Sequence, residues 1–194
     1  MSTWLDTETK ALLQQVPPEK LAPPDTGKFT LVILDRKREA NWRRVAQVLM
    51  QIPGISPMKA ILLSTCMLKP IVSGLSLPGA LLWQFELICC DAISVFVRDE
   101  IASSPDREHY LPQLRGQLLG SPEFSSVQVT VSAIPDNETG KRFVAQFLHG
   151  REGMLYRLRG VRYTFSGDMI RKKARIMAHW ADKIGATVVI ADDN

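Results

Sequence analysis

Residues 29–97 switch repeatedly between strand-like and helix-like patterns, and this order constrains the fold more than any other feature. The run Phe29–Leu34 is continuously apolar and β-rich, as is typical of a strand buried on both faces. In the helix that follows, Val45, Val48, Leu49 and Ile52 recur with the spacing of one helical face. The predicted elements are a strand at 29–34, helices at 41–52 and 57–66, a strand at 70–72, a helix at 77–90 and a strand at 93–97.

Capping residues and prolines place the ends of these elements. Ser56 suits an N-cap, and Pro57 suits the first helical turn, where the missing N–H of proline costs nothing. Ser76 is an equivalent N-cap for the third helix. Pro70 predicts that the short strand lies at the edge of its sheet, because proline cannot donate a ladder hydrogen bond.

The predicted helix at 77–90 is apolar on most sides, so we expect it to be central. Its cover must be supplied either by the C-terminal part of the chain or by a partner. The side chains that we predict to be partner-facing are Leu81, Trp83, Phe85 and Leu87.

The block has a family resemblance, carried by the element order and by two short stretches. Gly54–Ala60 contains a glycine start and Lys59 beside alanine, and Val72–Ser76 precedes the third helix. In these features the block resembles the C-terminal domain of the bacterial ribosomal stalk protein, a fold that the Clp protease adaptor also uses. The resemblance implies the fold alone. In the stalk family the third helix is rich in Glu and Lys, and only Lys59 matches that family's basic contact surface.

The remainder of the chain divides into an arm, a connection and a second unit. Residues 1–27 contain a short helical pattern and two proline pairs, which favour an extended linker. This arm is either poorly ordered or docked on the body or on a second copy. Polar residues after 98 mark a boundary, so we place the first domain at 28–101, a connecting helix at 102–124 and a basic domain at 125–194.

The second unit begins with strict alternation over Val127–Ser132, which predicts a half-buried strand. We expect a hairpin loop at 135–140, a second strand at 142–148 and a third at 155–165. A helix at 168–184 and a last strand at 187–190 complete a β-β-β-α-β order, and Gly185 suits the end of the helix. The fold class is therefore α+β, with two small units.

Excess positive charge lies in this second unit. Residues 1–124 hold equal numbers of acidic and basic residues, so the net charge of +4 falls in 125–194. The stretch Arg171–Ala178, preceded by a helix and three strands, resembles the basic helix of a double-stranded RNA-binding domain, which meets phosphates. A bulge at Gly160 would bring three strand arginines to one face. The candidate anion contacts are Arg157, Arg159, Arg162, Arg171, Lys172 and Arg175.

No catalytic or metal-binding constellation is recognisable in the sequence. The histidines are far apart, and none has a ligand-like spacing to a cysteine. Cys89 and Cys90 are adjacent and end an apolar helix, which indicates buried thiols in a reducing compartment. There is no leader-like start and no stretch apolar enough to span a membrane, so we expect a cytoplasmic protein.

These observations predict a non-enzymatic binding or adaptor protein with no cofactor and no metal. Its partner would be another protein or a second copy of the chain. The alternative is an RNA- or DNA-binding protein that uses the basic C-terminal unit. Steep loss of binding with salt would distinguish the second from the first.

Overall fold

A computed structural model describes residues 5–14, 27–36, 42–148, 155–158 and 162–191. The chain forms two compact units, unit 1 (Met1–Ser121) and unit 2 (Pro122–Asn194). Over the described residues, the strands form a three-stranded sheet in unit 1 and a four-stranded sheet in unit 2, which confirms an α+β fold of two small units. Within those residues, no helix is long and apolar enough to cross a bilayer.

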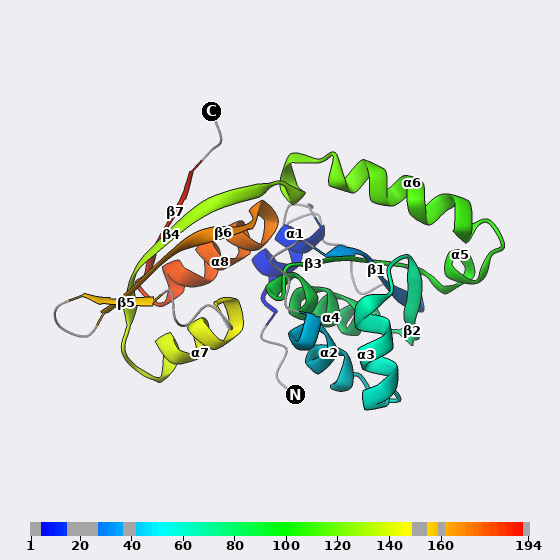
Figure 1. Ribbon diagram of the computed structural model, residues 1–194, viewed down its shortest axis with the longest axis horizontal. Helices are drawn as coiled ribbons and strands as arrows, with labels where there is room; N and C mark the ends of the chain where they lie inside the picture. Colours follow the sequence, from blue (N-terminus) through cyan, green and yellow to red (C-terminus); the bar gives the residue numbers. More distant parts are fainter. Residues whose placement is uncertain (1–4, 15–26, 37–41, 149–154, 159–161, 192–194) are drawn as a thin grey trace. The chain divides into compact units, whose positions relative to one another are not determined.

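Unit 1 follows the predicted β-α-α-β-α-β order, with one helix before it and two after it (Figure 1). Its elements are α1 (Thr7–Gln14), β1 (Phe29–Arg36), α2 (Trp42–Met50), α3 (Pro57–Thr65), β2 (Lys69–Leu75), α4 (Leu77–Cys89), β3 (Ala92–Arg98), α5 (Asp99–Ser103) and α6 (Arg107–Leu119). The antiparallel sheet has the order β2-β1-β3, so β2 is an edge strand, as Pro70 predicts. The central strand β1 is buried from Phe29 to Leu34.

Helix α4 is the centre of unit 1, as its apolar sequence predicts. It contacts α1, α2 and all three strands of the sheet. Leu81, Phe85 and Leu87 are buried, and Trp83 is partly buried against the core around Leu31 and Leu49. The prediction that these side chains face a partner is therefore wrong for Leu81, Phe85 and Leu87, because elements of the same unit cover them, and Trp83 is covered only in part.

Part of the N-terminal arm is docked on the body of unit 1. The Oδ1 atom of Asp6 accepts a hydrogen bond from the Thr9 N–H at 2.7 Å, which caps α1. Leu5 and Leu13 are buried, and α1 contacts α4. The docked alternative thus holds for residues 5–14, and the remainder of the arm up to residue 26 lies outside the described residues.

The predicted connecting helix at 102–124 belongs to unit 1. Helix α6 packs on β1, and the Arg115 guanidinium forms an ion pair with the Asp35 carboxylate at 2.9 Å. The boundary between the units falls after Ser121. The polar sequence after 98 marks α5 and a turn, and the domain boundary comes later.

Unit 2 differs from its predicted β-β-β-α-β order by one helix and one hairpin. Its elements are a short 3-10 helix (Pro122–Phe124), β4 (Ser126–Pro135), α7 (Glu138–Phe147), β5 (Leu155–Leu158), β6 (Arg162–Ile170), α8 (Arg171–Lys183) and β7 (Thr187–Ala191). The antiparallel sheet has the order β5-β6-β4-β7. The α-β-β-β-α order behind the likeness to a double-stranded RNA-binding domain is not the order observed.

The strand predicted at 142–148 is helix α7. Asn137 caps it, since its Oδ1 accepts a hydrogen bond from the Gly140 N–H at 3.0 Å. Phe143 and Phe147 lie one helical turn apart, with ring centroids separated by 5.1 Å. The spacing of these two rings fits a strand and a helix equally well, and the capping residue decides for the helix.

The strand predicted at 155–165 is a β-hairpin. β5 pairs antiparallel with β6, with Leu155 opposite Phe165 and Leu158 opposite Arg162. The chain therefore runs in opposite directions in β5 and β6, whereas the sequence predicts one strand with a bulge at Gly160, a residue that lies outside the described residues. β6 then continues along β4 to Ile170, so α8 begins three residues later than predicted.

Candidate protein-docking surface

The most unusual surface of the described residues lies on α3, a helix fixed firmly on unit 1. The Ser56 Oγ accepts a hydrogen bond from the Lys59 N–H at 3.3 Å, and Pro57 occupies the first turn, as predicted. Ala60, Leu63 and Ser64 are buried, and α3 packs beside α2 (Figure 1). One side of the helix is thus committed to the core.

The opposite side of α3 presents large apolar side chains to solvent. Met58 is 77% exposed, Ile61 45% and Leu62 62%. These positions are three and four residues apart, so they lie on one helical face. A surface helix ordinarily carries polar residues on that face. Met50, at the end of α2, is also exposed. We call these four residues, Met50, Met58, Ile61 and Leu62, the α2–α3 surface.

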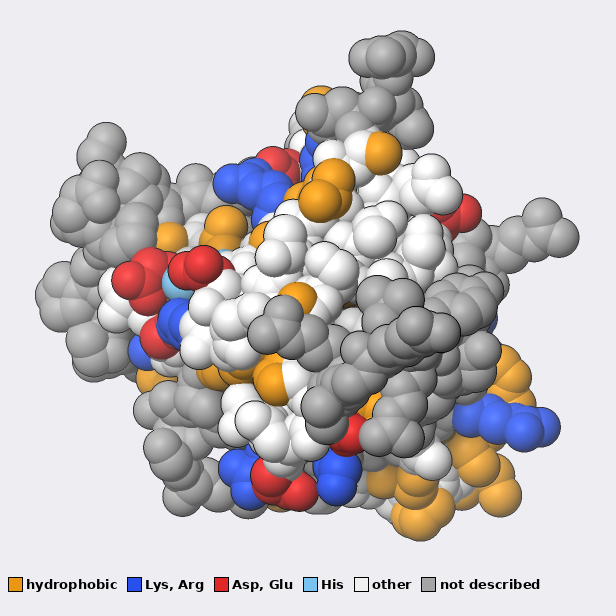
Figure 2. Space-filling model, turned by 90° about the vertical axis from the view of Figure 1, so that its left-hand side faces the viewer, with side chains coloured by type: hydrophobic (Ala, Val, Ile, Leu, Met, Phe, Trp, Pro, Cys, Tyr) orange, Lys and Arg blue, Asp and Glu red, His pale blue; other side chains and the backbone are white. Residues whose placement is uncertain are grey.

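The stretch of sequence that contains the α2–α3 surface carries charges of a single sign. Between Trp42 and Phe85 the chain contains no Asp or Glu, whereas Arg43, Arg44, Lys59 and Lys69 lie in this interval. Figure 2 shows hydrophobic side chains gathered at its lower right, with Lys or Arg side chains next to them. The α2–α3 surface is therefore apolar, and the charged residues nearest to it in the sequence between 42 and 85 are cationic.

The sequence points to this surface only indirectly. Helix α3 is apolar on several sides, which resembles the pattern of α4, and α4 proves to be core. The usable signal is the spacing of Met58, Ile61 and Leu62, which leaves Ala60 and Leu63 on the other side. A helix that has two apolar sides and only one buried side must expose the other.

The arginines predicted as anion contacts on the strands lie largely outside the described residues. The backbone pairing sets Arg157 opposite Tyr163 and Arg162 opposite Leu158, but the side chains of these two arginines are not described. Arg159 lies outside the described residues altogether. The single arginine row on one face therefore stays a prediction.

The basic start of α8 is largely used within unit 2. The Arg171 Nε donates to the Ser125 Oγ at 3.4 Å, and Arg175 forms an ion pair with Glu123. Lys172 is only 6% exposed, and its Nζ lies 5.1 Å from the centroid of the Phe124 ring. Lys172 is therefore not available as a phosphate contact, contrary to prediction.

Burial also changes the titration of Lys172. Desolvation lowers the pKa of Lys172 from 10.5 to about 8, Glu123 opposes this change, and Arg175 adds to it. A buried lysine with a lowered pKa at a functional site commonly serves chemistry. Here the amine is enclosed beside Phe124, which indicates a structural position.

Comparison of the chain with protein-family models, with curated protein sequences and with solved structures gives no match. The functional argument therefore rests on the two units themselves.

Proposed function

We propose that this chain is a non-enzymatic binding protein whose α2–α3 surface docks an acidic, amphipathic segment of a partner protein. The observation that carries the proposal is the solvent exposure of Met58 and Leu62 on a helix that lies in a stretch of sequence, 42–85, whose charged residues are all positive. An apolar patch of this kind on a folded unit commonly marks an interaction site.

The apolar side chains supply the affinity. Full burial of each large aliphatic side chain stabilises a complex by roughly 1.5–3 kcal/mol before the cost of association. Methionine side chains are flexible and polarisable, so they adapt to a partner surface. The helix beneath them is held by the Ser56 cap and by buried Leu63, so it needs little ordering on binding.

The charges select the partner. Arg43, Arg44 and Lys59 favour acidic residues beside the apolar face of a partner and disfavour basic ones. The same charges argue against a second copy of the chain. A symmetric dimer through this surface would place like charges opposite each other.

The nucleic-acid alternative has less support. Lys172 is buried and Arg175 is paired with Glu123, so the basic helix start lacks the exposed cluster that phosphate binding uses. We treat nucleic acid and an anionic membrane as outcomes of the test below.

Two variants at one position test the proposal. Leu62→Glu adds a negative charge to the surface, and Leu62→Lys adds a positive one. In quantitative capture from nuclease-treated host extract, we expect Leu62→Glu to weaken the bound partner by at least about tenfold and Leu62→Lys to weaken it less. Gln117→Glu, at an exposed position of α6, is the control and should bind like the wild type.

Cross-linking from position 62 should then map to a segment of the partner in which acidic and apolar residues alternate with helical spacing. Equal effects of Glu and Lys at position 62 would refute the charge argument. Loss of all binding after nuclease treatment would favour nucleic acid. Binding to phosphatidylglycerol vesicles, or a dimer in solution that Leu62→Glu dissociates, would replace the protein partner by a membrane or a second copy.

A further inference from the structure

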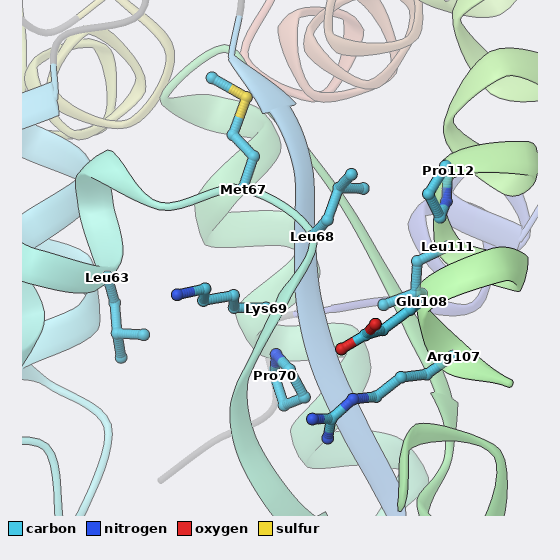
Figure 3. Close-up of a pocket in the computed structure, with 9 residues that line it drawn as sticks. All are labelled: Leu63, Met67, Leu68, Lys69, Pro70, Arg107, Glu108, Leu111 and Pro112. Carbon is cyan, nitrogen blue, oxygen red and sulfur yellow. The ribbon is translucent and has the colours of Figure 1, made fainter. Parts of the chain in front are cut away.

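A second site lies in unit 1, where a pocket of about 540 Å³ separates α6 from the start of β2. This volume is within the range of small-molecule sites. We call it the α6 pocket. Figure 3 shows the residues that line it, which are Leu63, Met67, Leu68, Lys69, Pro70, Arg107, Glu108, Leu111 and Pro112.

The wall of the α6 pocket is mainly apolar and partly rigid. Leu63 and Leu111 are buried, so their positions are fixed by the core of unit 1. Leucine, methionine and proline side chains offer no hydrogen bonds beyond the weak acceptor of the thioether. This part of the pocket therefore suits an aliphatic or aromatic group.

The ionic side chains of the pocket carry both signs. Arg107 and Glu108 are neighbours in the first turn of α6, and both reach toward Pro70, whereas Lys69 extends toward Leu63 (Figure 3). All three side chains are exposed. Within the described part of the chain, none of the three takes part in an ion pair. A cation and a carboxylate that point the same way without pairing can each accept an opposite charge from one ligand.

Two backbone features mark the same place. Leu68 has φ of 60°, a left-handed conformation that costs a leucine free energy, and its N–H is fixed by a 2.8 Å hydrogen bond to the Ile33 carbonyl. Pro112 has no N–H, so the Glu108 carbonyl one turn earlier receives no helical hydrogen bond from position 112. Both Glu108 and Pro112 line the pocket.

We propose that the α6 pocket binds a free α-amino acid with an apolar side chain. The ligand carboxylate pairs with Arg107. The ligand ammonium donates to the Glu108 carboxylate. The side chain packs on Leu63 and Leu111. The carboxylate and the ammonium of an amino acid share one carbon atom, so a single ligand can bridge two neighbouring side chains of opposite charge.

Titration calorimetry of the full chain with L-leucine tests the site, with three analogues as probes. Glycine lacks the apolar group and should bind roughly tenfold to a hundredfold more weakly. Leucinamide lacks the carboxylate and N-acetylleucine lacks the ammonium, so each should lose at least about tenfold in affinity.

Two variants assign each loss to its residue. In Arg107→Gln, leucine and leucinamide should bind equally weakly, because the group that distinguishes them is gone. In Glu108→Gln, leucine and N-acetylleucine should become equivalent. Arg142→Gln on α7 and Glu100→Gln on α5, both at exposed positions, are the matched controls and should retain wild-type affinity.

Absence of saturable leucine binding would overturn the proposal, as would analogue discrimination that survives in Arg107→Gln and Glu108→Gln. N-acetylleucine binding as tightly as leucine would also overturn it, because the site would then recognise the carboxyl end of a peptide. None of these results depends on Leu62, so the pocket and the α2–α3 surface are tested separately.

Discussion

Folded proteins usually bury apolar side chains and expose charged ones, and each of the two units breaks a different half of this rule. Unit 1 leaves Met58 and Leu62 in solvent, whereas unit 2 buries Lys172 and Lys173. Apolar residues on the surface are common one at a time, but a helical face of them is not. Buried lysines are rare and cost stability unless they are paired.

The exposed apolar residues of unit 1 and the buried lysines of unit 2 therefore suggest different roles, binding for the first and internal structure for the second. An exposed apolar face contributes little to the stability of unit 1, and for this reason we propose binding as its use. A lysine buried beside Phe124 and Glu123 acts within unit 2 and is closed to ligands. The most apolar helix, α4, is core, and two residues of the most basic helix start, Lys172 and Lys173 on α8, are buried. Composition alone points to α4 as the exposed apolar helix, whereas the exposed apolar face lies on α3. Composition also points to the start of α8 as a basic surface, whereas Lys172 there is buried.

Replacing Phe85 by alanine should give the largest loss of stability among the changes that compare buried with exposed residues. Phe85 is fully buried on α4, so its removal leaves a cavity and should lower the free energy of unfolding by about 3–5 kcal/mol. Leu62→Ala on the exposed face of α3 should change it by less than about 0.5 kcal/mol. Urea unfolding measures both. Similar losses in the two variants would mean that α3 and α4 do not differ in burial.

A pair of identical substitutions, one in each unit, should have opposite signs. A Cβ atom added at Gly140 would meet the Pro135 carbonyl oxygen at 1.7 Å, whereas one added at Gly116 on α6 meets nothing within 4 Å. Gly140→Ala should cost about 3 kcal/mol through overpacking. Gly116→Ala should gain about 0.5–1 kcal/mol, since alanine favours a helix interior. Thermal and urea unfolding should rank the variants in this order, and a stable Gly140→Ala protein would contradict the tight start of α7.

Most of unit 1 could be predicted because its signals are local. Ser56, Ser76 and Pro70 each act on their own turn or strand, and the structure confirms both N-caps and the edge strand. Unit 2 was less predictable because the spacing of its apolar residues fits both a strand and a helix. Phe143 and Phe147 fit two kinds of element, and only the bond from Gly140 to Asn137 selects the helix.

The site was harder to predict than the fold, because exposure is a property of tertiary packing. The helical spacing groups Met58, Ile61 and Leu62 on one side of α3, but spacing alone does not tell that Leu62 is exposed and Phe85 buried. Likewise, the sequence around Lys172 suggests an exposed basic side chain. Only the position of Phe124 in the fold shows that Lys172 is enclosed. The α6 pocket joins Lys69 to Arg107 across 38 positions of sequence, so no motif could reveal it.

Lys172→Met should stabilise unit 2 and remove part of its pH dependence. The fall in the pKa of Lys172 from 10.5 to about 8 corresponds to about 3 kcal/mol over the whole titration. Methionine keeps an apolar chain beside Phe124 but loses the attraction to Glu123, so we expect a net gain of about 2 kcal/mol at pH 7. Between pH 8 and 10.5 the unfolded lysine holds a proton that the folded one has released, so wild-type stability should rise with pH through this window.

Urea unfolding of the wild type and Lys172→Met at pH 7 and pH 9.5 measures this effect. The difference between the two proteins isolates Lys172 from other groups that titrate in the same window. The advantage of the variant should shrink as the pH rises, because the wild type no longer needs to bury a charge. Parallel profiles would show that the amine stays charged in the folded protein at both pH values, so that its pKa is not lowered by burial. The contrast between the units would then rest on exposed Met58 and Leu62 alone.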